Sequence, residues 1–283
     1  MADLLRSLPK VPRLRRAKPR PVPPSRHLRL VQANLQKKEG AAKLFRMLAE
    51  GADVVFLCEL NREVDIPQNF SVGDKRVKPY YSLAAGNKHG VGLVLASRLA
   101  PFSQQLLLGD TDGLVCAVEL TLPGLLPILL VSLYAPPAHP ENEYRNKVEG
   151  LLEPLLAKYE SVIMAGDFNA VSCPLLDVRG MRPPKQWDWF QGLLGKREAP
   201  ASFTDCYRMA RPMGSQFTRF PTVHQPSASR LDYFLASDPL LGQLELVDCF
   251  PQEFDDTANH YPSVCIFVAP SLPSPQCYRY QTP

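Results

Sequence analysis

The sequence predicts an α/β domain in which buried strands end on polar residues. The chain of 283 residues is long enough for one large α/β domain. Its 45% hydrophobic and 21% charged residues are the proportions of an ordinary globular protein. Short apolar runs typical of strands alternate along the chain with segments of helical periodicity. We therefore expect helices packed over buried sheets.

The first expected elements are two strands with a helix between them. Residues 28–34 alternate between apolar and polar side chains and predict a strand that ends at Asn34. Residues 39–49 carry apolar side chains at helical spacing. Residues 53–59 contain four consecutive apolar residues and then Glu59, as in a strand covered on both faces. Its position directly after this run makes Glu59 a candidate metal ligand rather than a solvated charge.

Further strands are expected at 90–97 and within 114–134, the second of which ends at Tyr134. The segment 114–133 is the most apolar part of the chain. It contains one acid, two prolines and a glycine, so we expect two strands around a turn and no membrane span. Residues 142–159 predict an amphipathic helix that leads into another apolar strand at 162–166.

The stretch Gly166-Asp167-Phe168-Asn169 ends that strand and is the centre of the functional prediction. Residues two apart on extended backbone point the same way, so Asp167 and Asn169 would be presented together. An acid can take a proton from water or hold a hard metal ion, and an amide can donate to a phosphoryl oxygen. The same residue types are also common in turns, so a purely structural turn remains open at this point.

The second half of the chain offers an acid and a histidine as a pair. Residues 229–237 predict a strand that holds Asp232 among apolar neighbours. A buried carboxylate is costly unless it is paired, and His260, just before a last strand at 263–268, is the expected partner. Trp187 and Trp189 lie in a short predicted helix, where core packing is favoured over a base-stacking platform.

Composition separates the first residues from the rest of the chain. Residues 1–26 hold eight Lys or Arg against one acid and are rich in proline, which predicts a disordered basic arm. The arm could be a nuclear-import signal, a non-specific nucleic-acid tether or a solvated tail without a partner. The seven cysteines form no CxxC pair, and several lie in apolar runs. They predict reduced core residues of an intracellular protein, with no disulfide partner and no zinc site. With the basic arm, a nuclear location is expected.

Taken in chain order, these candidate residues resemble the endonuclease/exonuclease/phosphatase superfamily over roughly residues 28–268. The segments 204–208 and 229–235 are similar to apurinic/apyrimidinic endonucleases, whereas 30–36, 166–170 and 218–221 look more like endonuclease domains of non-LTR retrotransposons. The resemblance implies a four-layer α/β sandwich of two mixed β-sheets flanked by helices. We expect this domain at 27–268, between the arm 1–26 and a C-terminal tail at 269–283.

The resemblance also implies a phosphodiester hydrolase that uses Mg²⁺, with Mn²⁺ as a possible substitute. By this resemblance Glu59 holds the metal ion with support from Asn34, and Asp167 activates the attacking water. The remaining roles concern the phosphate: Asn169 contacts it, Tyr134 donates to one of its oxygens, and His260, oriented by Asp232, meets the charge of the transition state. Arg219 and Arg230 are the expected substrate-binding residues.

Two departures from the family pattern qualify the prediction. The usual Ser-Asp-His motif is Ala258-Asn259-His260 here. We expect Asn259 to contact water around the metal ion and to weaken metal binding, because an amide is a poorer ligand for a hard cation than a carboxylate. Ser229 and Arg219 stand where the abasic-site enzymes carry aromatic residues, so abasic-site repair is not expected as the main activity.

The expected function is therefore a DNA endonuclease that nicks one strand and leaves a 3′-hydroxyl. One alternative keeps the fold and changes the substrate to RNA, a phosphoinositide or a protein-linked nucleotide. Another is a catalytically weakened module that only binds nucleic acid. The sequence leaves the oligomeric state open.

Overall fold

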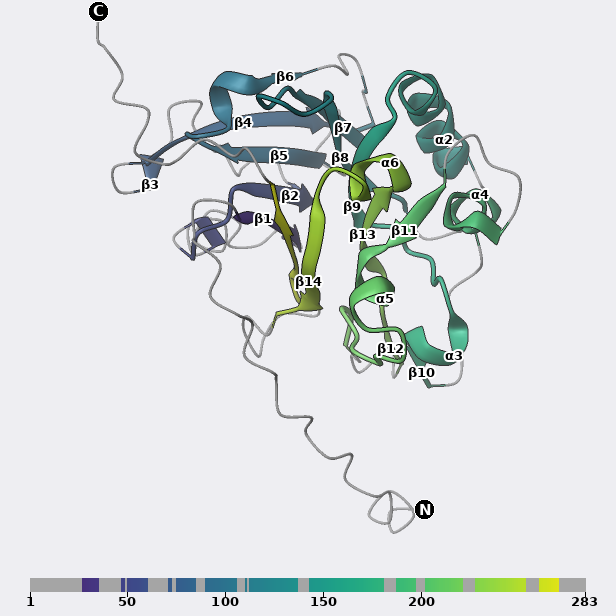
Figure 1. Cartoon of the computed structure of the whole chain (residues 1–283). Coiled ribbons are helices and arrows are strands. Elements are labelled where there is room, and N and C mark those ends of the chain that lie inside the picture. The colour runs from purple at the N-terminus through teal and green to yellow at the C-terminus, as the bar shows by residue number, and fades with distance from the viewer. Residues whose placement is uncertain are drawn as a thin grey trace, which may run out of the picture.

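The computed structural model describes residues 27–35, 47–48, 50–60, 71–72, 75–84, 90–105, 110, 112–136, 143–180, 187–196, 202–220, 227–252 and 260–269. Across these ranges two β-sheets pack against each other, and helices lie outside the second sheet (Figure 1). This arrangement confirms the predicted α/β sandwich of two mixed sheets. The predicted arm, most of the helix at 39–49, Asn259 and the tail after residue 269 lie outside the described residues.

The first sheet has seven strands within the described ranges. In order across the sheet they are β14 (Glu245–Pro251), β15 (Ser263–Val268), β1 (His27–Asn34), β2 (Val54–Cys58), β5 (Gly90–Ala96), β4 (Lys75–Leu83) and β3 (Ser71–Val72). Only the β1–β2 pairing among them is parallel, with Asn34 beside Cys58. The two strands therefore deliver Asn34 and the following Glu59 to the same edge.

The second sheet has six strands in the part of the chain that is described. Their order is β11 (Phe203–Asp205), β13 (Asp232–Ser237), β9 (Ser161–Asp167), β8 (Ile128–Tyr134), β7 (Val115–Leu120) and β6 (Ser103–Gln105). β8 runs parallel to β9 and places Tyr134 beside Asp167. β13 runs antiparallel to β9 and places Asp232 on the other side of Asp167. Backbone register alone thus makes three of the predicted site residues neighbours.

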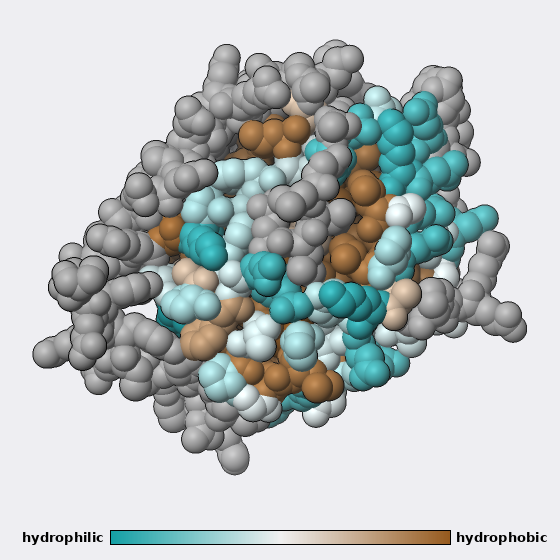
Figure 2. All heavy atoms as spheres, turned by 90° about the horizontal axis from the view of Figure 1, so that it is seen from above, coloured by the Kyte–Doolittle hydropathy of each residue, from teal (hydrophilic) through white to brown (hydrophobic). Residues whose placement is uncertain are grey.

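Short helices and one long helix complete the described structure. They are η2 (Ala100–Phe102), α2 (Glu143–Leu156), α3 (Pro174–Asp177), α4 (Asp188–Gln191), η3 (Gly192–Lys196), α5 (Cys206–Ala210) and α6 (Asp238–Leu241). A two-stranded ribbon pairs β10 (Val178–Arg179) with β12 (Ala228–Ser229). α2 buries Val148, Leu152 and Leu156. Seen from above, hydrophilic residues gather on the right of the molecule, the side on which α2 lies in Figure 1 (Figure 2). No helix among the described residues has the length and apolar character needed to cross a membrane.

The main hydrophobic core lies between the two sheets. Phe56 of the first sheet and Phe234 of the second meet edge to face, with ring centroids 5.6 Å apart. A smaller core, which includes Val55 and Val94, covers the other face of the first sheet. β2 is accordingly buried on both faces, as its apolar run predicts. Five of the six described cysteines are buried, and all six are free thiols.

Two long strands were not predicted, and each has an irregular pattern. β4 contains Pro79, a residue that usually argues against a strand in the middle of a sheet. β14 lies at the edge of its sheet and has a register shift between Leu246 and Asp248, which interrupts the alternation of buried and exposed side chains. Neither segment therefore shows the two-residue period by which a strand is recognised.

The two tryptophans pack into the fold. Trp187 is 4% exposed, and its indole nitrogen donates to Glu149 at 2.7 Å. Its ring lies near Phe168, which directly follows Asp167. Core packing, the favoured reading of the sequence, is confirmed for Trp187, whose ring helps to fix the turn after β9.

Candidate catalytic site

Asn34 joins two carboxylates that come from different sheets. Its Nδ2 atom donates to Glu59 Oε1 at 2.9 Å and to Asp167 Oδ2 at 3.2 Å. Asn34 is 1% exposed and Asp167 is equally buried, so these bonds lie at the inner edge of a shared site. The predicted convergence of Asn34, Glu59 and Asp167 is confirmed.

The backbone turns sharply where β2 and β9 deliver their acidic residues. Glu59 and Asn169 have φ values of 54° and 43°, in the left-handed region that non-glycine residues rarely occupy. The Asn169 amide N–H donates to Asp167 Oδ1 at 2.9 Å, which closes an Asx turn. The turn that a purely structural interpretation predicts therefore exists, and it also carries the candidate site residues Asp167 and Asn169. The turn orients the Asp167 carboxylate and gives the backbone N–H of Asn169 a hydrogen-bond acceptor.

Asn169 is held in place by its neighbours. Its side-chain Nδ2 donates to the carbonyl of Ala135 at 2.9 Å, and its own carbonyl accepts from the guanidinium of Arg145 at 3.0 Å. An amide nitrogen carries two N–H groups, so a second donor is available for a phosphoryl oxygen. Sequence reasoning did not identify Arg145, which is 4% exposed and supports this turn from α2.

Gly166 is required by the close approach of two parallel strands. A Cβ atom added at this position would lie 1.9 Å from the carbonyl oxygen of Leu133 on β8. Any side chain here would push β9 away from β8. The glycine in the motif therefore keeps Tyr134 and Asp167 adjacent.

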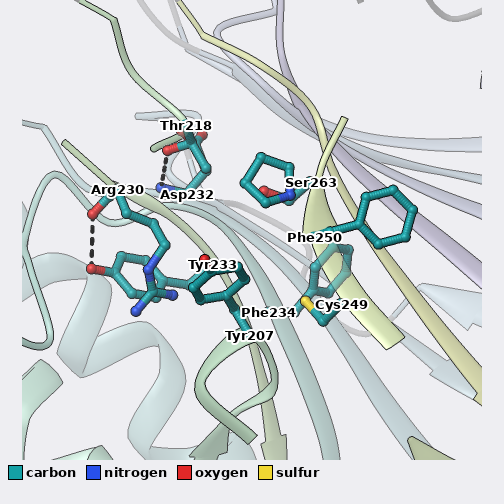
Figure 3. Close-up of a pocket in the computed structure, with 10 residues that line it drawn as sticks. Tyr207, Thr218, Arg230, Asp232, Tyr233, Phe234, Cys249, Phe250 and Ser263 are labelled. Carbon is teal, nitrogen blue, oxygen red and sulfur yellow. Dashed lines mark hydrogen bonds between the residues drawn. The ribbon is translucent and has the colours of Figure 1, made fainter. Parts of the chain in front are cut away.

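Asp232 and His260 form the predicted pair. His260 Nδ1 lies 3.0 Å from Asp232 Oδ2, and the Asp232 side chain is fully buried. Gln32 Nε2 donates to the other carboxylate oxygen, Oδ1, at 2.9 Å. The Thr218 hydroxyl oxygen accepts from the backbone N–H of Asp232 at 3.1 Å (Figure 3). The imidazole is therefore oriented by a carboxylate whose other oxygen is held by Gln32.

Gln32 and Thr218 are site-supporting residues that the sequence analysis missed. Gln32 lies two positions before Asn34 on the same strand, so alternation places both side chains on one face. That spacing was a usable signal. Thr218 gave no comparable signal, because its contact to Asp232 depends on how residues 216–220 pack against β13.

Burial and like charges set the protonation of the site. Burial, together with the charge of Asp232, raises the pKa of Asp167 to about 7. Burial alone would lower the pKa of His260, but the neighbouring carboxylate of Asp232 raises it to about 9. Burial also raises the pKa of Tyr134, assisted by the charges of Glu59 and Asp167. At neutral pH the site thus combines an imidazolium, a protonated phenol and an acid close to its titration point.

This set of side chains fits a divalent metal ion. The potential ligand atoms of Asp167, Asp232 and His260 all lie within 4.8 Å of one another, and Glu59 joins them through Asn34. Among the described residues of this cluster, the carboxylates outnumber the single imidazolium. Carboxylate and amide oxygens are the ligands preferred by hard cations such as Mg²⁺. A bound divalent cation would offset the excess negative charge.

The two predicted substrate-binding arginines have different positions. The backbone of Arg219 pairs with Ser229 and His260 in isolated bridges, which places Arg219 beside the Asp232–His260 pair. Arg230 is 1% exposed, and its guanidinium forms ion pairs with Asp177 at 2.9 Å and Asp205 at 2.6 Å. A side chain so enclosed cannot reach a substrate. The prediction that Arg230 binds substrate is therefore not supported, and its role is structural.

Arg230 belongs to a buried cluster beneath the site. Its guanidinium lies 4.3 Å from the centroid of the Tyr233 ring, and the Tyr233 hydroxyl donates to the carbonyl of Arg230 (Figure 3). The adjoining cavity, of about 10 Å³, is the size of one water molecule. It is a gap in the core, too small for a substrate.

Comparison with known proteins identifies the family. Residues 19–251 match the family model described as the Endonuclease/Exonuclease/phosphatase family. The chain belongs to this family. Members of the family are divalent-metal-dependent hydrolases, mostly nucleases or phosphatases. The resemblance inferred from the site residues is confirmed. No curated protein matches the chain.

Several solved structures of the family share the fold. An AP endonuclease, LMAP, from Leishmania major has a TM-score of 0.68 and 20% identity, covering 87% of this chain and 89% of its own. The catalytic domain of Xenopus laevis APE2 has the same score and identity, covering 88% and 95%. The endonuclease domain of TRAS1, a telomere-specific non-LTR retrotransposon, has a TM-score of 0.60 and 18% identity, covering 90% and 100%. At these identities the likeness establishes the fold alone.

Proposed function

We propose that this chain is a Mg²⁺-dependent phosphodiesterase that nicks one strand of DNA and leaves a 3′-hydroxyl. The observation that carries the proposal is the single Asn34 nitrogen that bonds both Glu59 and Asp167, next to the Asp232–His260 pair. Acids from both sheets and an oriented imidazolium thus surround one point. That is the arrangement that phosphoester hydrolysis requires.

The metal ion, when bound, would neutralise charge on the phosphate, and Glu59 would hold it with Asn34 alongside. Mn²⁺ can take the same oxygen ligands. Asn259 is proposed to contact water around the ion. These assignments rest on the oxygen-rich donor set and on the excess of carboxylates over cationic side chains.

The other side chains act on the water and the phosphate. Asp167 in its ionised form takes the proton from the attacking water. Asn169 donates to a phosphoryl oxygen, and Tyr134, which stays protonated, donates to a non-bridging or leaving oxygen. Asp232 holds His260 by Nδ1, so the opposite ring nitrogen, Nε2, meets the negative charge of the transition state. Arg219, beside His260, contacts a neighbouring phosphate.

DNA is the proposed substrate for three reasons. One of the similar structures is described as an AP endonuclease, and another as the endonuclease domain of a retrotransposon. Arg219 replaces an aromatic residue that an abasic pocket would need, which favours nicking over abasic-site repair. The basic arm at 1–26 carries Lys and Arg side chains that would release counterions from DNA phosphates on binding. A nuclear location is part of the same proposal.

The decisive experiment is nicking of supercoiled plasmid by the full chain with Mg²⁺, and again with EDTA. We expect open-circular product only with the metal ion, and a loss of at least about 100-fold in rate for Asp167→Ala. Tyr144→Ala, an exposed substitution on α2, is the matched control and should nick normally. Equal nicking by Asp167→Ala would place the chemistry elsewhere.

A second experiment tests the alternative that the chain is a catalytically weakened module that only binds nucleic acid. If Asn259 weakens the metal site, Asn259→Asp should nick faster at limiting Mg²⁺. Metal-independent DNA binding without nicking by either protein would identify the chain as a binding module. Hydrolysis of a ribonucleotide or phosphoinositide substrate, with plasmid left intact, would move the proposal to that substrate class.

A further inference from the structure

A surface groove adjoins the catalytic histidine and is unused by the mechanism above. Its volume is about 680 Å³, and its described lining residues are Arg29, Arg179, Ser215, Gln216, Phe217, Phe220, Phe250, Pro251, Gln252 and Tyr261. Aromatic rings and arginines dominate this lining, and no carboxylate belongs to it. The groove therefore combines π surfaces with positive charge.

Among the described residues, no acid neutralises the arginines of the groove. The guanidinium of Arg29 donates to the side-chain oxygen of Gln252 at 3.2 Å, and its Nε atom is buried without a partner. Arg179 is exposed on β10. Within the described residues neither arginine is paired with a carboxylate. Within the part of the chain that the structure describes, both charges are therefore open to an anionic ligand.

The aromatic wall of the groove is built into the catalytic framework. The rings of Phe220 and Tyr261 lie 4.3 Å apart between centroids, tilted by 43°. Tyr261 directly follows His260, and its backbone N–H donates to the carbonyl of Thr218 at 2.7 Å. Thr218 in turn accepts from the backbone of Asp232. The groove thus begins one residue away from the imidazole that faces the phosphate.

We propose that this groove binds a single-stranded segment of the DNA substrate that flanks the cleaved phosphate. Arg29 and Arg179 contact its phosphates, and Phe220 with Tyr261 stacks on its bases. Aromatic stacking requires unpaired bases, which is why the ligand is single-stranded rather than duplex. The proposal rests on the proposed nuclease function, since it names a subsite of the same enzyme.

Binding is tested with fluorescently labelled dT12 and the full chain carrying Asp167→Asn, so that hydrolysis does not interfere. In this background Phe220→Ala should weaken binding by about tenfold, and Phe220→Tyr, which keeps a ring, should bind like the parent. Arg29→Ala and Arg179→Ala should each lower the slope of log affinity against log salt by about 0.7. Tyr144→Ala and Lys158→Ala, both exposed on other surfaces, are the matched controls and should change neither value.

Several outcomes would overturn the inference. Unchanged dT12 affinity in Phe220→Ala, with the fold verified by thermal melting, rules out stacking at this wall. An unchanged salt slope in both arginine variants rules out phosphate contact. Competition by polyglutamate that depends on the arginines but not on Phe220 would show a general polyanion site. Because Arg179 is exposed, its substitution keeps the test valid even if Phe220→Ala fails to fold.

Failure of the groove and failure of the nuclease proposal give different results. If the wild-type chain nicks plasmid but the groove variants bind dT12 normally, the groove assignment is wrong and the nuclease proposal is supported. If the wild-type chain never nicks but dT12 binding depends on Phe220 and the arginines, the groove binds single-stranded DNA without being a substrate subsite, and the nuclease proposal is wrong.

Discussion

His260 titrates mainly against the fixed carboxylate of Asp232, with smaller contributions from Asp167 and Glu59, and its titration therefore affects stability. Its folded-state pKa of about 9 lies above the ordinary value of 6.5 because of Asp232. A group with a raised folded-state pKa contributes stability that is complete below the unfolded value and is lost as pH rises through the folded value. Asp167, with a pKa of about 7, titrates at a lower pH than His260.

We therefore expect the free energy of unfolding without metal to fall by roughly 2–3 kcal/mol between about pH 7 and pH 9. Urea unfolding of the full chain in EDTA at several pH values measures this loss. Asp232→Asn removes the charge that raises the histidine pKa, so its stability should vary much less across the same window. An identical pH dependence in Asp232→Asn would show that another group is responsible.

At the scale of elements, the parallel pair β8–β9 is the part of the second sheet that the site depends on most. Tyr134 and Asp167 are register partners at the ends of these strands. Their close spacing is possible because Gly166 leaves the carbonyl of Leu133 unobstructed. The contact joins backbone to backbone, so no side-chain rotation can relieve a clash there.

Gly166→Ala should therefore destabilise the fold by about 3 kcal/mol or more, since β9 must shift to admit the methyl group. Chemical denaturation measures the loss, and plasmid nicking should fall with it because Tyr134 and Asp167 move apart. Gly150→Ala is the matched control, because a Cβ at that helical position meets nothing within 4 Å. A fully stable Gly166→Ala protein would contradict the register described here.

At the scale of the whole molecule, the sheets face each other with acidic residues clustered where they meet. A cation that binds this cluster in the folded chain and not in the unfolded chain raises stability by mass action. Mg²⁺ or Mn²⁺ at about 100 times its dissociation constant should add about 2.7 kcal/mol to the unfolding free energy. Thermal melting with and without the metal tests this. Glu59→Gln should lose most of the increase, whereas Glu153→Gln, exposed on α2, should keep it.

The sequence allowed prediction of what is local to each strand. Glu59 and Asp167 were found because an acid directly follows or ends an apolar run, and Asn34 because a strand ends on it. The sequence does not indicate which strands are neighbours. The adjacency of Tyr134, Asp167 and Asp232 therefore follows only from the structure.

Arg230 shows the limit of sequence reasoning most clearly. The family resemblance suggested that Arg230 contacts substrate. Its actual partners, Asp177 and Asp205, are 53 and 25 positions away in the chain. Long-range ion pairing of this kind leaves no periodic pattern in the sequence. The same holds for the groove, whose walls come from β1, β10, β14 and two loops.

The pairing of β1 with β15 brings the first and last described strands of the chain into one sheet. Residues before Gly90 supply Asn34 and Glu59, yet His260 and the strand that anchors it come last. A chain still emerging from the ribosome therefore carries acids but no imidazole beside them. The proposed nuclease site would therefore be completed only when His260 and β15 have been made.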